Sequence, residues 1–476
     1  MESRPRNARR TLIAVLAGVG VILVLWCTLP LAFSEAVVPF PWTVVARLGI
    51  FISGGEIWIQ MGITLARTAV GFLLALVAGT AAGFLSGRLA FFSRSFFLPV
   101  SIIQGAPPLL WIIPLVLILG TGGLAPVGVV FFVVLPIVII SVQEGIKTLD
   151  PAVEEMMKVY ASSPFVLVRD FYIPGLSGHF KSLLISGLLV GLKSSIIGEW
   201  FGARSGIGRM INEYFYNFDM PSFYAVALFY VLSVVLVSWL MGRLGKHAFT
   251  RRVTTVPAEA GRENTSVQRR AGPARLEFHG VSFSFGRRRV CDHLDFSLGK
   301  SMTVVLTGDS GAGKTTLARL SLGLLKPKTG RVVLPRRACL LFQEDVFLNH
   351  RDCLGNVMLA VPDKTSDYAA GRGLAALEAV GLGEYVHHFP DELSGGMRKR
   401  LAFARALAFD PDFIILDEPF NKLHKKARRE LWDLHFRLFT GRGVPSLIIT
   451  HYPEELSDRS RLSFFEMREG KVTAVK

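Results

Sequence analysis

Long apolar runs fill the first half of this 476-residue chain and limit its fold more than any other feature. They lie near residues 11–33, 59–85, 96–119, 124–143, 181–200 and 223–242. A helix needs about 20 apolar residues to cross a bilayer, so these runs predict six membrane-spanning helices. The remaining sequence has the composition of a soluble protein. We therefore expect an all-α membrane domain at residues 1–252 and a separate soluble domain behind it.

The first apolar run has a rival interpretation as a cleaved signal peptide, because several arginines precede it. The apolar core of a signal peptide usually has about 7–15 residues, and residues 11–33 exceed that length. The run therefore predicts a retained helix whose N-terminus is cytoplasmic.

The net charge of +16 also permits two interpretations, nucleic-acid binding or the positive-inside bias of a membrane protein. The basic residues flank apolar runs: Arg4, Arg6, Arg9, Arg10, Arg88, Arg94, Arg243, Lys246, Arg251 and Arg252. This placement favours membrane lipid as the surroundings and predicts no nucleic-acid partner. An even number of spans puts the soluble half in the cytoplasm, with residues 34–58 and 201–222 facing outward.

A polar stretch at residues 144–180 separates the fourth and fifth runs. Its segment from Pro151 to Tyr160 has helical spacing, with Ala152, Met156 and Val159 on one face, and Pro174 closes it. From the residues alone, it is equally an interfacial helix or a docking helix for a partner domain.

The same stretch resembles the cytoplasmic coupling loop of ABC importer permeases, with its pattern E-A-A, G-A-S and a final hydrophobic-proline pair. The matching residues are Glu154, Ala161, Ser162 and Pro174. Glu155 and Met156 depart from the two alanines, and Tyr160 departs from the glycine. The resemblance implies a helix that docks on an ATPase domain.

More of this half is similar to permeases of the nitrate, sulfonate and taurine importers, over roughly residues 36–250. Pro107 and Pro108 predict a broken helix, because proline lacks an N–H and clashes with the preceding turn. Glu199 is a candidate pathway residue at the end of the fifth span. Lys193 is a weak partner for it, since residues six apart lie on different faces of a helix.

After a polar linker at residues 253–274, the soluble domain begins at residue 275 and runs to 476. Its stretch TVVLTGDSGAGKTTLARL matches G-x-x-x-x-G-K-[ST], preceded by a strand pattern and followed by a helix pattern. Such a loop wraps phosphates with backbone N–H groups, and its lysine and threonine address phosphate oxygens and Mg²⁺. The predicted ATP-binding residues are Gly308, Asp309, Ser310, Gly311, Ala312, Gly313, Lys314, Thr315 and Thr316.

The stretch LSGGMRKRLAFARAL resembles the ABC signature motif, although its serine is also a good helix cap. The resemblance implies that Ser394, Gly395 and Gly396 complete the ATP site of another subunit. The residues expected to order the attacking water and the γ-phosphate are Glu418, His451 and Gln343. The residues expected to bind Mg²⁺ are Thr315, Gln343 and Asp417. Phe285 stands where this family stacks an aromatic ring on adenine. The predicted fold of this domain is the α/β P-loop fold of ABC ATPases.

One departure concerns NKLH, residues 421–424, where the family has a loop ending in aspartate. His424 brings no fixed negative charge at neutral pH. We expect hydrolysis to persist, with an altered rate or cooperativity between two sites.

Three functions remain open from the sequence: a fused importer, a half-exporter and a non-catalytic ATP-gated channel. The coupling loop favours the importer, and the intact ATPase motifs disfavour the channel. The importer implies a homodimer, a separate extracytoplasmic solute-binding protein, and ATP with Mg²⁺. Its substrate is a sulfonate, nitrate or similar anion by resemblance, or alternatively a thiamine-precursor pyrimidine or other small metabolite.

Overall fold

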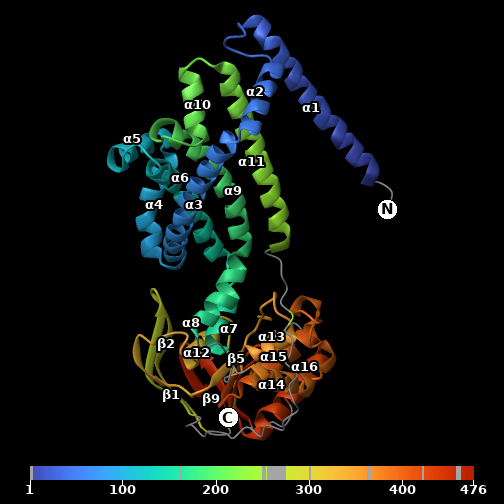
Figure 1. Cartoon of the computed structure of the whole chain (residues 1–476). Coiled ribbons are helices and arrows are strands. Elements are labelled where there is room, and N and C mark those ends of the chain that lie inside the picture. The colour runs from blue at the N-terminus through green and yellow to red at the C-terminus, as the bar shows by residue number, and fades with distance from the viewer. Residues whose placement is uncertain are drawn as a thin grey trace. The chain divides into compact units, whose positions relative to one another are not determined.

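The protein divides into two compact units, shown in a computed structural model (Figure 1). The structure describes residues 4–160, 163–248, 254, 275–299, 302–361, 366–420, 423–456 and 462–475. The first unit comprises residues 1–149 and 175–250, and the second comprises residues 150–174 and 251–476. The expected linker at 253–274 lies outside the described residues except for residue 254.

The first unit is helical. Its helices are α1 (Arg4–Ala32), α2 (Pro41–Gly54), α3 (Glu56–Arg88), α4 (Ala90–Gly105), α5 (Pro108–Leu119), α6 (Leu124–Thr148), α9 (Ile173–Gly202), α10 (Ile207–Tyr216) and α11 (Met220–Ala248). Among described residues, 4 helices are long and apolar enough to span a membrane, or 5 if the bent pair α4–α5 forms one span. Residues 17–32 of α1 form a shorter apolar helix, so the count of six spans stays a prediction.

The break between α4 and α5 confirms the effect predicted for the two prolines. The helices meet at an angle of 97°, between Gly105 and Pro108. Proline at the first position of α5 lacks only an N–H that the helix would leave unpaired there.

Helices α3 and α6 pack closely because small residues recur along one face of α3. Gly71, Ala75, Gly79 and Gly83 are all buried, at intervals of four residues. A Cβ atom on Gly79 would lie 2.7 Å from the Cβ of Val138, so only glycine permits this approach. Small-residue stripes of this kind bring helices together in membranes, where lipid removes the usual hydrophobic drive.

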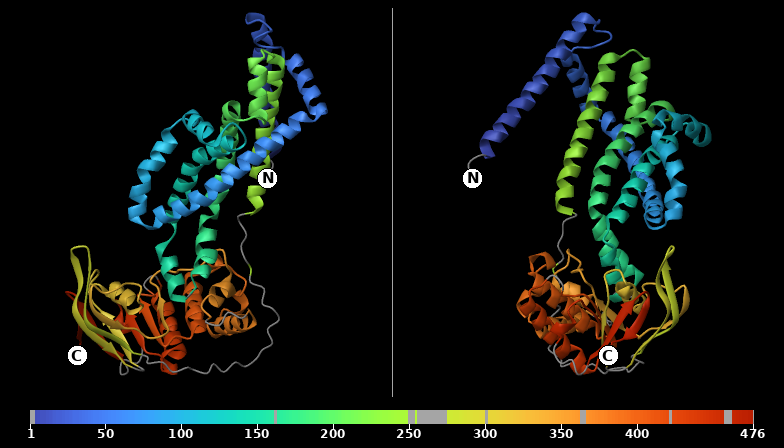
Figure 2. Two further views of the ribbon diagram at one scale, coloured as in Figure 1. Left: turned by 60° about the vertical axis from the view of Figure 1, so that its left-hand side comes forward. Right: turned by 180° about the vertical axis from the view of Figure 1, so that it is seen from behind.

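The second unit begins with the predicted docking helix, α7 (Pro151–Tyr160), followed by α8 (Pro164–Leu167) and a π-helical turn, Val168–Tyr172. Figure 2 shows this segment against the strands and helices of its own unit in both views. The buried side chains of α7 are Met156, Met157 and Tyr160. The predicted face with Ala152 and Val159 was therefore wrong in part. Hydrophobic spacing alone did not reveal that Tyr160 packs inward.

Two sheets form the framework of the second unit. The antiparallel sheet has the order β2-β1-β4, with β1 (Leu276–Phe285), β2 (Arg288–Leu298) and β4 (Thr329–Val333). The larger sheet has the order β5-β6-β7-β3-β8-β9, with β5 (Ala338–Leu341), β6 (Phe413–Asp417), β7 (Ser446–Ile449), β3 (Thr303–Thr307), β8 (Leu462–Arg468) and β9 (Lys471–Ala474). Only its β8–β9 pair is antiparallel among the described strands.

The second unit also contains five longer helices, among its described residues: α12 (Lys314–Ser321), α13 (Cys353–Met358), α14 (Ser366–Ala379), α15 (Gly395–Phe409) and α16 (Lys425–Leu438). Short 3₁₀ turns occupy Gly383–Tyr385, Pro390–Glu392, Thr440–Arg442 and Pro453–Glu455. The residues of β3, β6 and β7 are almost all buried, as the apolar runs predicted for central parallel strands. The carboxyl ends of β5, β6, β7 and β3 therefore share one edge, where α/β proteins bind ligands.

A histidine lies inside this unit among aromatic rings. His435 of α16 is fully buried, and neither ring nitrogen has a hydrogen-bond partner among the described residues. Phe403, Phe420, Trp432 and Phe439 contribute neighbouring rings. Burial lowers the pKa of His435 from 6.5 to about 3, because the apolar surroundings disfavour the charged ring.

This burial predicts a pH-dependent stability. The unfolded chain binds the His435 proton near pH 6.5 but the folded chain only near pH 3, so stability is lost as pH falls below 6.5. Between about pH 7.5 and about pH 5.5, His435 should contribute a loss of about 1.4 kcal/mol. Thermal unfolding of the purified full chain should therefore be less pH-sensitive for His435→Leu than for wild type. Equal pH sensitivity of the two proteins would contradict the assignment.

Candidate functional site

The glycine-rich loop follows β3 and leads into α12. Gly308 has a φ of +141°, and a Cβ atom there would lie 2.5 Å from the carbonyl oxygen of Met467, so the position requires glycine. Gly311 and Gly313 also have positive φ angles. Lys314 Nζ donates to the carbonyl oxygens of Gly308 at 2.7 Å and Asp309 at 3.0 Å, so the ammonium group lies against its own loop.

An acidic group approaches this loop from β6. The hydroxyl of Thr315 hydrogen-bonds to the carboxylate of Asp417, the last residue of β6. Burial raises the pKa of Asp417, although the Thr315 hydrogen bond acts in the opposite direction. Two hard oxygen donors are thus adjacent, which is the donor type that Mg²⁺ prefers.

The three predicted catalytic side chains meet beside Asp417. His451 Nε2 lies 2.8 Å from Glu418 Oε1, and Gln343 Nε2 donates to Glu418 Oε2 at 3.3 Å. They come from the ends of three neighbouring strands, β7, β6 and β5. Parallel strands bring the three side chains to one edge of the sheet, although Gln343 and Glu418 are 75 positions apart in the chain.

Glu418 has an unusual backbone. Its φ angle is +45°, in the left-handed region that residues other than glycine rarely adopt. The Glu418 N–H nevertheless donates to the carbonyl oxygen of Ile449 at 2.9 Å, which joins it to the end of β7. Such a conformation persists only where the surroundings hold it, and it is common at functional sites.

Phe285 lies at the end of β1 and is 53% exposed, so it is not a core residue. Its ring meets that of Phe283 edge to face, with centroids 5.0 Å apart. An exposed ring that packs against a second ring has the geometry of a stacking platform. The assignment of Phe285 to adenine stays a prediction.

The signature segment opens α15. Ser394 is the N-cap, and its hydroxyl accepts a hydrogen bond from the N–H of Met397 at 3.4 Å. Gly395 and Gly396 form the first turn, whose N–H groups favour an anion. A cleft of about 540 Å³ beside them is lined by residues that include Gln343, Gly395 and Leu423.

Tyr160 of α7 fills an interior position of the second unit. It is 4% exposed, and its hydroxyl donates to the carbonyl oxygen of Leu340 in β5 at 3.1 Å. The buried guanidinium of Arg405 in α15 lies 4.9 Å from the ring centre, and Phe409 meets the ring edge to face. Tyr160 thus contacts both the strand that leads to Gln343 and the helix that begins at the signature.

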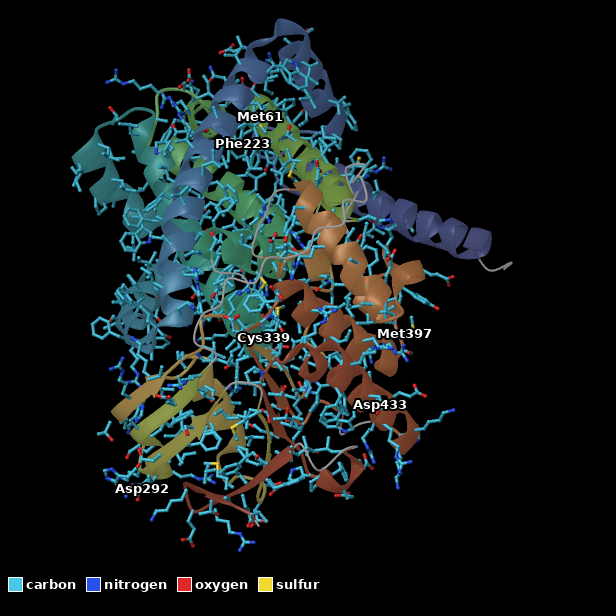
Figure 3. The ribbon with its side chains drawn as sticks, turned by 90° about the horizontal axis from the view of Figure 1, so that it is seen from below. Met61, Phe223, Asp292, Cys339, Met397 and Asp433 are labelled. Atoms are coloured by element: carbon cyan, nitrogen blue, oxygen red, sulfur yellow. The ribbon has the colours of Figure 1, made fainter. Side chains whose placement is uncertain are left out.

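Figure 3 shows Cys339 of β5 in this interior, between the antiparallel sheet near Asp292 and the helices that carry Met397 and Asp433. Burial raises the pKa of the Cys339 thiol to about 12 and raises that of Tyr160 well above its usual value. Both groups are therefore neutral at physiological pH.

Ion pairs hold the ends of the same segment. Glu155 pairs with Arg319 of α12 at 3.1 Å, and Asp170 pairs with Arg351 at 2.7 Å. Sequence reasoning missed these pairs because nothing in either local pattern names a distant partner.

The pattern residues of the coupling loop have mixed outcomes. Glu154 pairs with Lys158 within α7 at 2.8 Å, and Pro174 is the second residue of α9. Ala161 and Ser162 lie outside the described residues. Their predicted roles in docking stay predictions.

His424 is the N-cap residue of α16, and its side chain makes no capping bond to the described backbone. Its side chain is exposed. The expected effect of this histidine on the rate of hydrolysis stays a prediction.

Glu199 has a different partner from the one considered in the sequence. Its fully buried carboxylate pairs with Arg67 of α3 at 2.9 Å, not with Lys193. It also accepts from the hydroxyl of Thr64 at 2.8 Å and from the N–H of Gly208 at 3.0 Å. Three donors on two other helices thus fix one carboxylate.

Comparisons with known families agree with both halves of this description. The family model described as "Binding-protein-dependent transport system inner membrane component" matches residues 71–249. The model described as "ABC transporter" matches residues 291–421.

Individual relatives match the second half. The aliphatic sulfonates import ATP-binding protein SsuB 2 of Paracoccus denitrificans is 38% identical over 204 residues, which are 42% of this chain and 80% of that protein. SsuB of a Mycobacterium species is 38% identical over 185 residues, 38% of this chain and 76% of that protein. The taurine import ATP-binding protein TauB of Pseudomonas aeruginosa is 35% identical over 196 residues, 38% of this chain and 74% of that protein.

A helical membrane part joined to an ATPase whose predicted catalytic residues lie at the carboxyl ends of parallel strands defines a transporter driven by ATP. The chain belongs to the ABC transporters, with a binding-protein-dependent permease and an ABC ATPase fused in one polypeptide. It is a multi-pass membrane protein and an importer that couples ATP hydrolysis to transport. The predicted order of an all-α membrane part and an α/β ATPase part is confirmed.

The convergence on Glu418 predicts a loss of hydrolysis without a loss of ATP binding. Replacement of Glu418 by glutamine keeps the shape but removes the basic carboxylate, so kcat should fall about 100-fold or more. ATPase assays and nucleotide-binding measurements on the purified full chain check this. Glu430→Gln, at an exposed carboxylate on α16, is the control and should retain the wild-type rate. Wild-type hydrolysis by Glu418→Gln would exclude this role.

Proposed function

We propose that the edge formed by β3, β5, β6 and β7 binds and hydrolyses Mg²⁺-ATP. The loop N–H groups and Lys314 would hold the phosphates, and Phe285 would stack on adenine. Thr315, Asp417 and Gln343 would hold Mg²⁺, which supplies charge neutralisation at the phosphates. Among the described residues no three His, Cys, Asp or Glu side chains form a metal cluster, so phosphate oxygens would complete the coordination.

Glu418 would then orient the attacking water and accept its proton, and His451 would contact the γ-phosphate. The short contacts from Gln343 and His451 to one carboxylate support this division of roles. Hydrolysis breaks the bond between the γ-phosphorus and its bridging oxygen and releases ADP and phosphate.

A homodimer would complete each site. One chain carries one signature segment and one phosphate loop, and the family sandwiches ATP between those of two subunits. A two-fold axis would pair each loop with the partner's signature segment, which is the commonest symmetry for a dimer of one chain.

The substrate proposal rests on one observation, a binding-protein-dependent permease joined to an ATPase that is similar to sulfonate and taurine import ATPases. A small sulfonate would be delivered by a separate extracytoplasmic binding protein and released into the cytoplasm. The N-terminus and the ATPase part would be cytoplasmic, in the inner membrane. Nitrate and pyrimidine metabolites are the alternatives that the test must separate.

The full chain should be reconstituted in proteoliposomes with the solute-binding protein encoded beside it. Thermal shifts of that binding protein with taurine, methanesulfonate, nitrate and a pyrimidine would identify the ligand class. Labelled ligand should then accumulate only with ATP, Mg²⁺ and the binding protein together. Transport without any binding protein would overturn the importer, and binding of the pyrimidine alone would overturn the sulfonate.

The position of Tyr160 gives a second test, of docking by the coupling loop. A protease site placed within residues 253–274 of the full chain would allow the linker to be cut after purification. The ATPase fragment should stay with the wild-type permease fragment on gel filtration and separate from it in Tyr160→Gly, which removes the buried ring. Lys158→Gly is the matched control, because it places the same glycine at an exposed position of α7. Equal retention by both variants would contradict the role of Tyr160.

A further inference from the structure

Helix α16 carries positive side chains in its first turn, where a helix is stabilised by negative ones. His424 is the N-cap, and Lys425 and Lys426 follow it in the first turn without any acidic residue. The N-terminus of a helix carries partial positive charge and is stabilised by anions. A negative charge near Lys425 comes from Glu455, which belongs to the 3₁₀ turn that follows His451.

Arg428 connects Glu455 to α16 with a bidentate ion pair. Its Nε donates to Glu455 Oε2 at 2.7 Å, and its Nη2 donates to Glu455 Oε1 at 2.6 Å. A planar guanidinium matches a carboxylate in this way, whereas a lysine does not. The hydrogen bonds from Arg428 lower the pKa of Glu455, the largest of several influences on it.

The same guanidinium makes two further contacts. Nη1 donates to the carbonyl oxygen of Leu423 at 2.7 Å, and the group lies 4.6 Å from the ring centre of Tyr452. The side chains of Arg428 and Glu455 are 15% and 6% exposed. A largely enclosed pair with four contacts differs from the exposed pairs that add little to stability.

These contacts join the two chain segments that carry the catalytic groups. Leu423 ends the short segment that begins after Glu418, and Tyr452 directly follows His451. One small cavity is lined by Glu418, Arg428, Tyr452 and Glu455 with four neighbours, so the ion pair and the glutamate with the positive φ angle border the same cavity. Moving Arg428 therefore alters the support on both sides of the Glu418–His451 contact.

We propose that Arg428 is a positioning residue for ATP hydrolysis. By bonding Leu423 and Glu455 at once, it fixes the segment after Glu418 relative to the segment after His451. It does this in a loop where His424 provides no negative charge. The proposal rests on the proposed roles of Glu418 and His451 and adds to them a group that would act through the two chain segments that follow them.

The test uses steady-state ATPase kinetics of the purified full chain. Arg428→Gln and Glu455→Gln should each lower kcat by about tenfold to 100-fold, while the KM for ATP changes by less than about twofold. The double variant should be no slower than the slower single variant, because both substitutions break one contact. Arg429→Gln is the matched control, because the Arg429 side chain neighbours Arg428 in the sequence but is exposed. The rate of this variant should equal that of wild type.

The melting temperature and gel-filtration profile of each variant separate positioning from folding. A merely structural role would lower the yield or melting temperature but leave kcat unchanged in the folded fraction. Unchanged kcat in both single variants, or multiplied losses in the double variant, would overturn the proposal. Glu418→Gln is measured in parallel: if it is inactive while Arg428→Gln has the wild-type rate, the proposed hydrolysis stands and only the positioning role fails.

Discussion

The carboxyl edge of the parallel sheet is the constraint on which the ATPase part depends. Strands β5, β6, β7 and β3 are neighbours and run in one direction, so their ends deliver four loops to one place. The hydrogen-bonded ladder fixes the spacing of those ends. Gln343, Glu418 and His451 can therefore meet although they are far apart in the chain. Glu418 has its rare backbone conformation at a place where its N–H also bonds to Ile449 at the end of β7.

The sequence predicted this edge well, for a physical reason. Each motif combines a short buried strand with the residues directly after it, and both signals are local. The helix Pro151–Tyr160 and the break at Pro107–Pro108 were confirmed for the same reason. The pairing of Arg428 with Glu455 is not local, since 27 residues separate them and neither occurs in a distinctive pattern. Such pairs become visible only when the fold has placed them together.

The buried position of Tyr160 was also beyond the sequence. The spacing of α7 indicated a face with Ala152, Met156 and Val159, yet the buried side chains include Tyr160, which stands where the family pattern has glycine. Its hydroxyl bonds to Leu340, 180 residues away. A glycine there would leave space beside Arg405, whose buried charge then loses an aromatic neighbour. The tyrosine that replaces the glycine of the pattern thus has partners in β5 and α15. The sequence of the loop alone does not reveal these partners.

The buried carboxylate of Glu199 also has partners that are distant in the sequence. A carboxylate in a membrane segment suggests a transport pathway. Here, however, Arg67, Thr64 and Gly208 already donate to it, and Arg67 also donates to the carbonyl oxygen of Ser205 at 2.6 Å. Removing one partner of such a pair leaves a buried charge and typically costs about 3–5 kcal/mol. In this structure the Glu199 carboxylate joins α9 to α3 and to the first turn of α10, and its candidate role in a transport pathway stays a prediction.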